Sequence, residues 1–273
     1  MDAQTLRAQA FKALHERAGA FVIPNPWDAG SAKMLASLGF EALATTSAGY
    51  AFSNARPDGA MTLDETLANV RAIVAATNLP VAVDLENGFA DDPAECAQSI
   101  LRAAEAGAVG GSIEDATGRE ATPIYCFEHA VARIEAAVAV ARSLPFPFML
   151  TARAENYLHG NPDLADTIRR LQAFAEAGAD VLYAPGLRNA EEVLAVVRAV
   201  TPKPVNVLMS GGLKLTVEQL SEMGVKRISV GSALALAAYG EFYRAAEEIK
   251  TSGTFGFTSR SMPYAKTNQL FKG

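Results

Sequence analysis

The residues from Val81 to Phe89 (VAVDLENGF) place two carboxylates where an apolar, strand-like run gives way to a glycine turn. Because side chains alternate along an extended segment, Asp84 and Glu86 are expected to point to the same side. Neighbouring carboxylates repel each other and resist the loss of water unless a cation binds between them. Hard oxygen ligands suit Mg²⁺, with Mn²⁺ as the alternative, so this stretch predicts a divalent-metal site.

Short apolar segments that alternate with amphipathic helical patterns must position these acids. Four helical patterns end at a glycine that leads directly into an apolar segment, at Gly39, Gly107, Gly178 and Gly224, and glycine is a common left-handed stop after a helix. The predicted strands are residues 20–23, 41–46, 81–84, 109–114, 147–151, 180–184, 204–207 and 226–230. The predicted helices after them include 62–77, 92–106, 128–143, 163–177 and 232–250.

Eight consecutive βα units predict an α/β fold, a (β/α)8 TIM barrel with a leading N-terminal helix, as a single domain over residues 1–273. A doubly wound open sheet is the alternative, but no GxGxxG fingerprint follows the first strand.

Polar residues gather at the carboxyl ends of the predicted strands, which form the working face of such a barrel. One alternative is that Glu114 and Arg153 form only a structural ion pair. Four acids and an arginine on adjacent strands favour a functional site, because burying several uncompensated acids is costly. The candidates beyond Asp84 and Glu86 are Ser47, Ala48 and Gly49 after strand two, Ser112, Glu114 and Asp115 after strand four, Thr151, Arg153 and Glu155 after strand five, and Asn206 on strand seven.

Only one of the three histidines is a candidate for the predicted site. His159 follows strand five and is a candidate substrate contact, whereas His15 and His129 are assigned to the surfaces of helices. Glycine turns at residues 210–212 and 230–232 suit either phosphate binding or close helix packing.

Composition limits the partners. A formal net charge of −6 argues against nucleic acid or an anionic membrane as a partner, and no apolar run is long enough to span a membrane. Two cysteines cannot form a disulfide framework, so we expect a reducing cytoplasmic location. The tail from Thr251 onward carries aromatic residues that must be covered, either by its own barrel or by a partner subunit.

These residues resemble the isocitrate lyase and phosphoenolpyruvate mutase superfamily, and the resemblance covers nearly the whole chain. The superfamily's D-x-D-x-G-[YF]-G stretch is similar to DLENGFA at residues 84–90, with Glu86 in place of the second aspartate. Its E-D pair resembles Glu114 and Asp115, its A-R-[TA]-[DE]-A pattern resembles residues 152–155, and its strand-seven asparagine resembles Asn206.

The resemblance implies Mg²⁺ on the acid cluster, with Asp84 as principal ligand and Glu86 and Glu114 binding directly or through water. It implies that Arg153 holds a substrate carboxylate and that the backbone of residues 47–49 donates to the developing enolate oxygen. It also implies a homo-oligomer built as a dimer of dimers, in which the C-terminal helix is exchanged between subunits.

The loop after strand four departs from the best-known branches. Isocitrate and methylisocitrate lyases carry a K-[KR]-C-G-H segment there, whereas residues 116–126 read ATGREATPIYC, and we expect this loop to close over the site. The phosphonate-handling branch usually has a lysine just after E-D, where Ala116 stands.

The predicted function is therefore an Mg²⁺-dependent lyase that cleaves a carbon–carbon bond in a small 2-oxo or 2-hydroxy di- or tricarboxylic acid through a pyruvate-type enolate. Decarboxylation of an oxaloacetate-like acid is the least demanding version, and methylisocitrate lyase-like cleavage is the other. The alternatives are carbon–phosphorus chemistry, as in phosphonopyruvate hydrolase or phosphoenolpyruvate mutase, and a non-catalytic metabolite-binding barrel.

Overall fold

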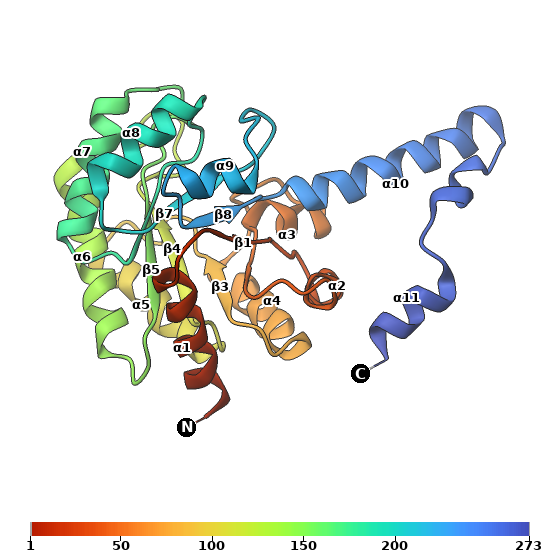
Figure 1. Cartoon of the computed structure of the whole chain (residues 1–273), viewed down its shortest axis with the longest axis horizontal. Helices are drawn as coiled ribbons and strands as arrows, with labels where there is room; N and C mark the ends of the chain where they lie inside the picture. Colours follow the sequence, from red (N-terminus) through yellow and green to blue (C-terminus); the bar gives the residue numbers. More distant parts are fainter. Residues whose placement is uncertain (1, 273) are drawn as a thin grey trace.

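The computed structural model describes residues 2–272, which form one parallel sheet surrounded by helices (Figure 1). The strands are β1 (Phe21–Ile23), β2 (Leu43–Ala44), β3 (Val81–Asp84), β4 (Gly110–Glu114), β5 (Met149–Arg153), β6 (Val181–Tyr183), β7 (Val205–Leu208) and β8 (Arg227–Ser229). The helices are α1 (Ala3–Glu16), α2 (Ala29–Ser37), α3 (Ser47–Ser53), α4 (Leu63–Ala76), α5 (Pro93–Glu105), α6 (Phe127–Ser143), α7 (Leu164–Glu176), α8 (Ala190–Val200), α9 (Val217–Glu222), α10 (Ala233–Ser252) and α11 (Tyr264–Phe271), with a 3-10 turn η1 (Gly256–Arg260) between the last two.

The eight strands curl into a nearly closed barrel. Parallel pairing runs in the order β1-β8-β7-β6-β5-β4-β3-β2. Between β1 and β2, the Ala44 N–H donates to the Pro24 carbonyl oxygen at 3.1 Å, which brings the two ends of the sheet together. The predicted (β/α)8 barrel with its leading helix is confirmed, and the carboxyl ends of all eight strands meet at one mouth.

The four glycines predicted to stop helices all have a left-handed backbone. Their φ angles are +85° at Gly39, +98° at Gly107, +104° at Gly178 and +88° at Gly224. A side chain in this region of φ is strained, so glycine allows each helix to turn directly into the next strand. This repeated turn explains why the βα units could be counted from sequence.

Helix α1 closes the bottom of the barrel. Its Phe11 and Leu14 form one apolar cluster with barrel residues that include Phe21 and Met149. His15, predicted at the surface, is buried instead: its Nδ1 lies 2.8 Å from the Phe11 carbonyl oxygen and its ring packs edge-on against Phe21. Burial, and next the charge of Arg227, lower the pKa of His15 to about 3, so the ring is neutral. The prediction that His15 lies at the surface was wrong, because the spacing of apolar residues along a helix does not show that the helix covers the bottom of a barrel.

The main core lies between the outside of the barrel and its helices. Phe148 and Leu150 of the β5 region are buried there with Ile134 of α6 and Phe174 of α7. Each such side chain contributes about 1.5–3 kcal/mol of burial free energy, which holds the strand ends in fixed positions.

Strand β2 is shorter than the predicted 41–46. Thr46 leaves the sheet because its side chain caps α3, accepting the Gly49 N–H. The polar run predicted to follow strand two is therefore the first turn of a helix, and its backbone N–H groups lie at the barrel mouth.

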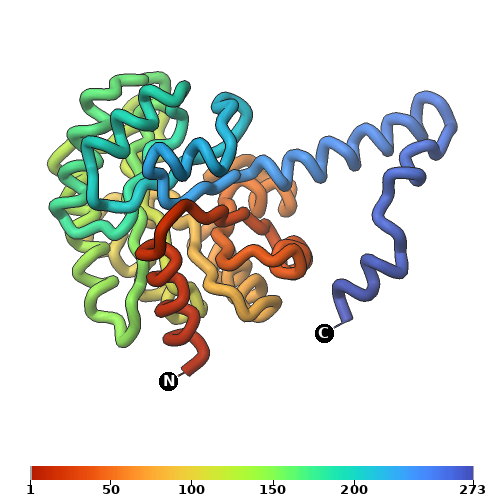
Figure 2. Tube along the Cα trace, viewed as in Figure 1, coloured from red at the N-terminus to blue at the C-terminus, as the bar shows by residue number. Residues whose placement is uncertain are grey.

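The C-terminal part forms an arm. Helix α10 extends away from the barrel, and η1 and α11 turn back from its far end (Figure 2). Lys33 Nζ donates to the Phe271 carbonyl oxygen at 3.5 Å, where α11 reaches α2. The arm exposes large apolar side chains, namely Leu236, Phe242, Tyr243, Ile249, Phe255, Met262, Tyr264 and Phe271. None of the helices within residues 2–272 has the length and apolar character needed to cross a membrane.

Candidate active site

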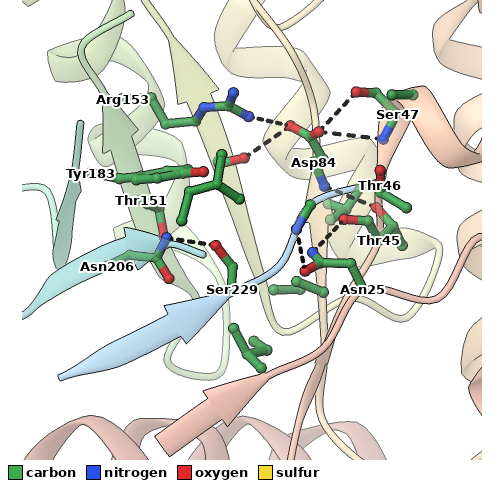
Figure 3. A pocket seen from close by; sticks show the side chains of 18 of the residues that line it. Asn25, Thr45, Thr46, Ser47, Asp84, Thr151, Arg153, Tyr183, Asn206 and Ser229 are labelled. Atoms are coloured by element: carbon green, nitrogen blue, oxygen red, sulfur yellow. Dashed lines mark hydrogen bonds and ion pairs between the residues drawn. The ribbon is translucent and has the colours of Figure 1, made fainter. Parts of the chain in front are cut away.

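A cavity of about 220 Å³ opens at the carboxyl ends of the strands. This volume suits a small organic acid, since larger ligands occupy clefts of roughly 300–1,000 Å³. Figure 3 shows side chains from several strands and from the start of α3 directed toward one another here. The polar side chains that line it are Asn25, Thr45, Thr46, Ser47, Asp58, Asp84, Ser112, Thr151, Arg153, Tyr183, Asn206, Arg227, Ser229 and Ser232.

Asp84 stands at the end of β3 and accepts hydrogen bonds on both carboxylate oxygens. Ser47 donates to Oδ2 from its Oγ at 2.9 Å and from its N–H at 3.3 Å. Ser112 Oγ donates to Oδ1 at 3.2 Å. Arg153 Nη1 donates to the same oxygen at 2.8 Å (Figure 3). The Asp84 N–H donates to Thr45 Oγ1 at 3.0 Å. The carboxylate is thus fixed where the ends of β2, β3, β4 and β5 meet.

Arg153 contacts three carboxylates. Its Nη1 lies 2.8 Å from Asp84 Oδ1, and its Nη2 lies 3.1 Å from Glu114 Oε2. Its Nε lies 2.8 Å from Glu155 Oε1, and its guanidinium carbon lies 5.1 Å from the centre of the Tyr183 ring. Burial works to lower the pKa of Arg153, but the three acids outweigh it and raise that pKa. The ion pair between Glu114 and Arg153, which the sequence offered as an alternative, is present, and it is one of three ion pairs that Arg153 forms.

The acids around Arg153 outnumber it, and two of them, Glu86 and Glu114, resist ionisation. Glu86 follows β3 with a left-handed φ of +49°, and its Oε1 is buried without a hydrogen-bond partner among residues 2–272. Burial, then the charges of Asp84 and Asp58, raise the pKa of Glu86 to about 8. Burial also raises the pKa of Glu114 well above its ordinary value. These shifts mark a site that would be stabilised by added positive charge.

The acid cluster fits a divalent ion by donor type and by charge. Carboxylate oxygens are the ligands that Mg²⁺ and Mn²⁺ prefer, and the partnerless Oε1 of Glu86 is such an oxygen. Within residues 2–272, however, no three Asp, Glu, His or Cys side chains already surround one point. Asp84 and Glu114 are paired with Arg153 instead. Holding an ion would require these two carboxylates to exchange part of that pairing for the metal.

The start of α3 supplies backbone donors at the cavity. Ser47 and Ala48 line the cavity, but the Gly49 N–H is already used, donating to Thr46 Oγ1 at 3.2 Å. Gly49 matters for space: a Cβ there would lie 2.7 Å from Thr46 Cγ2 and 3.1 Å from Trp27 Cβ. Of the three residues predicted from sequence, Ser47 and Ala48 can face a ligand, and Gly49 lets the helix start pack closely.

Asn206 lies deeper in the cavity with a fixed orientation. Its Oδ1 accepts from Arg227 Nε at 2.9 Å. Its Nδ2 donates to Ser229 Oγ at 2.9 Å (Figure 3). Arg227 also donates from Nη2 to Thr151 Oγ1 at 2.8 Å. These bonds determine which face of the Asn206 amide is available to a ligand.

Some of the predicted site residues do not line the cavity, namely Gly49, Glu86, Glu114, Asp115, Glu155 and His159. Glu155 is buried behind Arg153, and its N–H donates to Asp115 Oδ1 at 2.8 Å. His159 is exposed, and the neighbouring Leu158 lines the cavity in its place. The prediction that His159 contacts the substrate gains no support from this arrangement.

Sequence reasoning missed Asp58, Tyr183 and Arg227. Asp58 lies in RPDGA, a typical turn sequence, and only the fold brings it beside the acids, where burial and the Asp84 charge raise its pKa. Arg227 did carry a signal: an arginine in the apolar run VKRISV, with the same strand parity as Ser229, must point into the barrel with it. Tyr183 gave no signal, since a tyrosine in a strand is ordinary.

The loop at residues 116–126 is anchored at both ends. Ala116 forms an isolated antiparallel bridge with Ile124, and Tyr125 packs against the Arg133 guanidinium at 4.2 Å. Arg170 Nη1 donates both to Asp115 Oδ2 and to the Tyr125 carbonyl oxygen at 3.0 Å. The expected closure of this loop stays a prediction.

The fold and site together define a (β/α)8 enzyme class in which acids and an arginine gather at the ends of β3, β4 and β5. The chain belongs to the phosphoenolpyruvate phosphomutase family, whose model matches residues 11–250. The superfamily inferred from the acidic motifs is thereby confirmed.

Similar proteins agree with this assignment. The "putative lyase/mutase" of Burkholderia cenocepacia J2315 has a crystal structure with a TM-score of 0.97 and 59% identity, covering 100% of this chain and 98% of that one. The 2-methylisocitrate lyase of Halalkalibacterium halodurans is 30% identical over 90% of this chain and 83% of its own. The oxaloacetate decarboxylase of Paraburkholderia xenovorans is 29% identical over 76% of this chain and 69% of its own. The protein is an enzyme of this lyase and mutase superfamily.

Proposed function

We propose that this protein is an Mg²⁺-dependent lyase that breaks a carbon–carbon bond in a small 2-oxo or 2-hydroxy di- or tricarboxylic acid. The observation that carries the proposal is the cluster of carboxylates around Arg153, together with a buried Glu86 Oε1 that has no hydrogen-bond partner among residues 2–272. The size of the cavity and the similarity to a 2-methylisocitrate lyase and an oxaloacetate decarboxylase support the same substrate class.

Different residues would hold the metal ion and stabilise the substrate oxygen. Asp84, Glu86 and Glu114 would hold the ion, with Mn²⁺ as an alternative to Mg²⁺. When bound, the ion would supply positive charge opposite the substrate C2 oxygen, which gains negative charge as the bond at C3 breaks. The Ala48 N–H at the start of α3 would donate to the same oxygen, since the Ser47 and Gly49 N–H groups already donate to Asp84 and Thr46. A fixed donor of this kind costs no reorganisation during the reaction.

Arg153 would bind the carboxylate next to that oxygen. Its guanidinium is rigidly placed over Tyr183 and faces the cavity. A bidentate contact from such a group aligns a planar carboxylate, so the C3 bond can be held in the orientation that favours cleavage.

Decarboxylation of an oxaloacetate-like acid is the reaction we favour. Loss of CO₂ needs no general acid, and the loop at residues 116–126 has neither the lyase cysteine motif nor the lysine of the phosphonate-handling branch. Its Cys126 is exposed and immediately precedes α6. Methylisocitrate-type cleavage would need another proton donor.

Carbon–phosphorus chemistry is the second candidate. It is favoured by the match to the phosphoenolpyruvate phosphomutase family model. Ala116 stands where that branch usually has lysine. A phosphonate bound here would therefore lack one positively charged partner that it has in that branch. A binding barrel without catalysis is less well supported, because it gives no reason for the costly acid cluster.

The experiment follows pyruvate formation from oxaloacetate in the presence of Mg²⁺ and after addition of a chelator. We expect release of pyruvate well above the spontaneous rate with Mg²⁺ and loss of that excess with chelator. A rate equal to the spontaneous one under both conditions would contradict the decarboxylase proposal. Orthophosphate release from phosphonopyruvate would support the second candidate.

A further inference from the structure

Arg227 lies across the inside of the barrel, beneath the acid cluster. It starts from β8, and its Nη2 donates to Thr151 Oγ1 on β5 at 2.8 Å. Its Nε donates to Asn206 Oδ1 on β7 at 2.9 Å. Thr151 pairs in register with Ser112, which pairs in turn with Asp84. The guanidinium therefore reaches the strand two places away from the principal acid, within the same cavity.

This buried cation has no carboxylate partner among the residues that the structure describes. Arg227 is only 6% exposed, and none of the ion pairs formed within residues 2–272 includes it. Besides burial, the groups that shift the pKa of Arg227 are Tyr183 and Arg153, and neither is a carboxylate. His15, toward the bottom of the barrel, is neutral. An uncompensated buried charge is costly, so the fold retains one here at the expense of stability.

The two arginines of the cavity differ in what they contact. Arg153 is paired with three acids, whereas Arg227 contacts only a threonine hydroxyl and an asparagine amide. An arginine has five N–H donors, and these two bonds use only part of them. Within residues 2–272 the hydrogen bonds of Arg227 use Nε and Nη2, which leaves Nη1 to donate to a ligand in the cavity that the side chain lines.

We infer that Arg227 forms a second anion-binding subsite at the floor of the cavity, which takes a carboxylate of the substrate. The inference rests on the proposed function, since it assumes that this cavity binds the substrate. One anionic group would bind near Arg153 at the mouth and another near Arg227 at the floor. The preferred ligands are then small dianions, and monocarboxylates of similar size bind more weakly.

The test measures binding of malonate and of acetate by calorimetry, with Mg²⁺ and with chelator, to the wild-type protein and three variants. Arg227→Met removes the charge and keeps the length of the side chain. Arg227→Lys keeps the charge but loses the planar fork. Arg17→Met makes the same change of side chain at an exposed arginine that does not line the cavity, and serves as the control. Circular dichroism establishes that each variant is folded.

We expect the wild-type protein to bind malonate at least tenfold more tightly than acetate, because two charges are paired instead of one. Arg227→Met should weaken malonate binding about tenfold or more and reduce the preference over acetate, while Arg17→Met changes malonate binding less than about threefold. If Arg227→Met does not fold, Arg227→Lys should still weaken malonate binding more than Arg17→Met does. Equal malonate affinity in wild type and the Arg227 variants, or no preference for malonate in the wild type, would overturn the inference.

This binding assay needs no turnover, so it separates the two proposals. Malonate binding that depends on Arg227 in a protein that releases no pyruvate would refute the lyase and keep the subsite. If the protein releases pyruvate in a metal-dependent way but the Arg227 variants bind malonate as tightly as the wild type, the subsite is refuted and the lyase proposal stands.

Discussion

Arg153 Nη1 lies 2.8 Å from Asp84 Oδ1, and both side chains are largely shielded from water. The chain therefore carries a built-in cation at the carboxylate that we propose as the principal metal ligand. This arrangement gives Arg153 two roles. It compensates the acids before an ion binds, and it lies beside the proposed position of the substrate carboxylate.

Replacing Arg153 by lysine tests this relationship. Lysine keeps the charge but cannot contact three carboxylates through one planar group. We expect Arg153→Lys to lower the free energy of unfolding by about 2–3 kcal/mol in chelator and to raise KM for the substrate. Urea unfolding and steady-state kinetics measure the two effects.

Arg17→Lys is the matched control. Arg17 contacts Glu41 through two hydrogen bonds of 2.7 and 2.6 Å, but both side chains are exposed. An exposed pair contributes about 0–1 kcal/mol, so this variant should be nearly unchanged. Equal effects in the two variants would remove Arg153 from its central position.

The raised pKa of Glu86, about 8, predicts how stability depends on pH in the absence of metal. Between its ordinary value of 4.5 and about 8, the folded chain holds a proton that the unfolded chain has released. Stability therefore falls as pH rises through this window. Glu86→Gln cannot lose that proton, so its Tm in chelator should fall less than that of the wild type between about pH 5 and about pH 9.

Glu16→Gln supplies the comparison for that series. It makes the same change of side chain at an exposed position on α1. We expect its pH profile to follow the wild type. A Glu86→Gln profile parallel to the wild type would show that Glu86 ionises normally.

Gly49→Ala tests the packing at the start of α3. The added methyl group would lie 2.7 Å from Thr46 Cγ2 and 3.3 Å from Ala235 Cβ, so α3 must shift. We expect a loss of about 1–3 kcal/mol in stability, and lower activity because Ser47 and Ala48 move with the helix. Gly212→Ala is the control, since the nearest atom there is 4.0 Å away. Equal stability of the two variants would show that the start of α3 can accommodate a methyl group at position 49.

The exposed apolar arm leads us to propose a homo-oligomer, which the superfamily resemblance implies to be a dimer of dimers. Phe242 on α10 is 72% exposed, which is costly unless another surface covers it. We expect the wild type to be oligomeric by light scattering at micromolar concentration and Phe242→Glu to dissociate it. Leu6→Glu, at an exposed position on α1, should leave the oligomer intact. A monomeric wild type would refute the proposal.

The barrel could be predicted from sequence because its signals are local. Each of the four predicted glycines stops a helix, and apolar strands alternate with amphipathic helices. The predicted strand over residues 41–46 was too long because the capping role of Thr46 depends on an N–H in the following turn. The burial of His15 also depends on distant residues, which meet it only after the barrel closes.

The site could be predicted only in part. Strand parity identified Asp84, Ser112 and Arg153, because side chains at the ends of adjacent parallel strands must converge. It did not reveal that Arg153 contacts three acids, since that depends on rotamers across neighbouring strands. Asp58 was missed because a turn residue has no periodic signal, and its place beside the acids comes from the tertiary fold.

The most direct test of the central claim is pyruvate release from oxaloacetate, 2-methylisocitrate and phosphonopyruvate in parallel, with Mg²⁺ and with chelator. Asp84→Asn is the matched variant, because it keeps the shape of the side chain but loses the ligand charge. We predict metal-dependent pyruvate from oxaloacetate or 2-methylisocitrate, reduced at least about 10³-fold in Asp84→Asn, which corresponds to about 4 kcal/mol of transition-state stabilisation. Full activity in Asp84→Asn or in chelator, or pyruvate with phosphate from phosphonopyruvate alone, would contradict a metal-dependent carbon–carbon lyase.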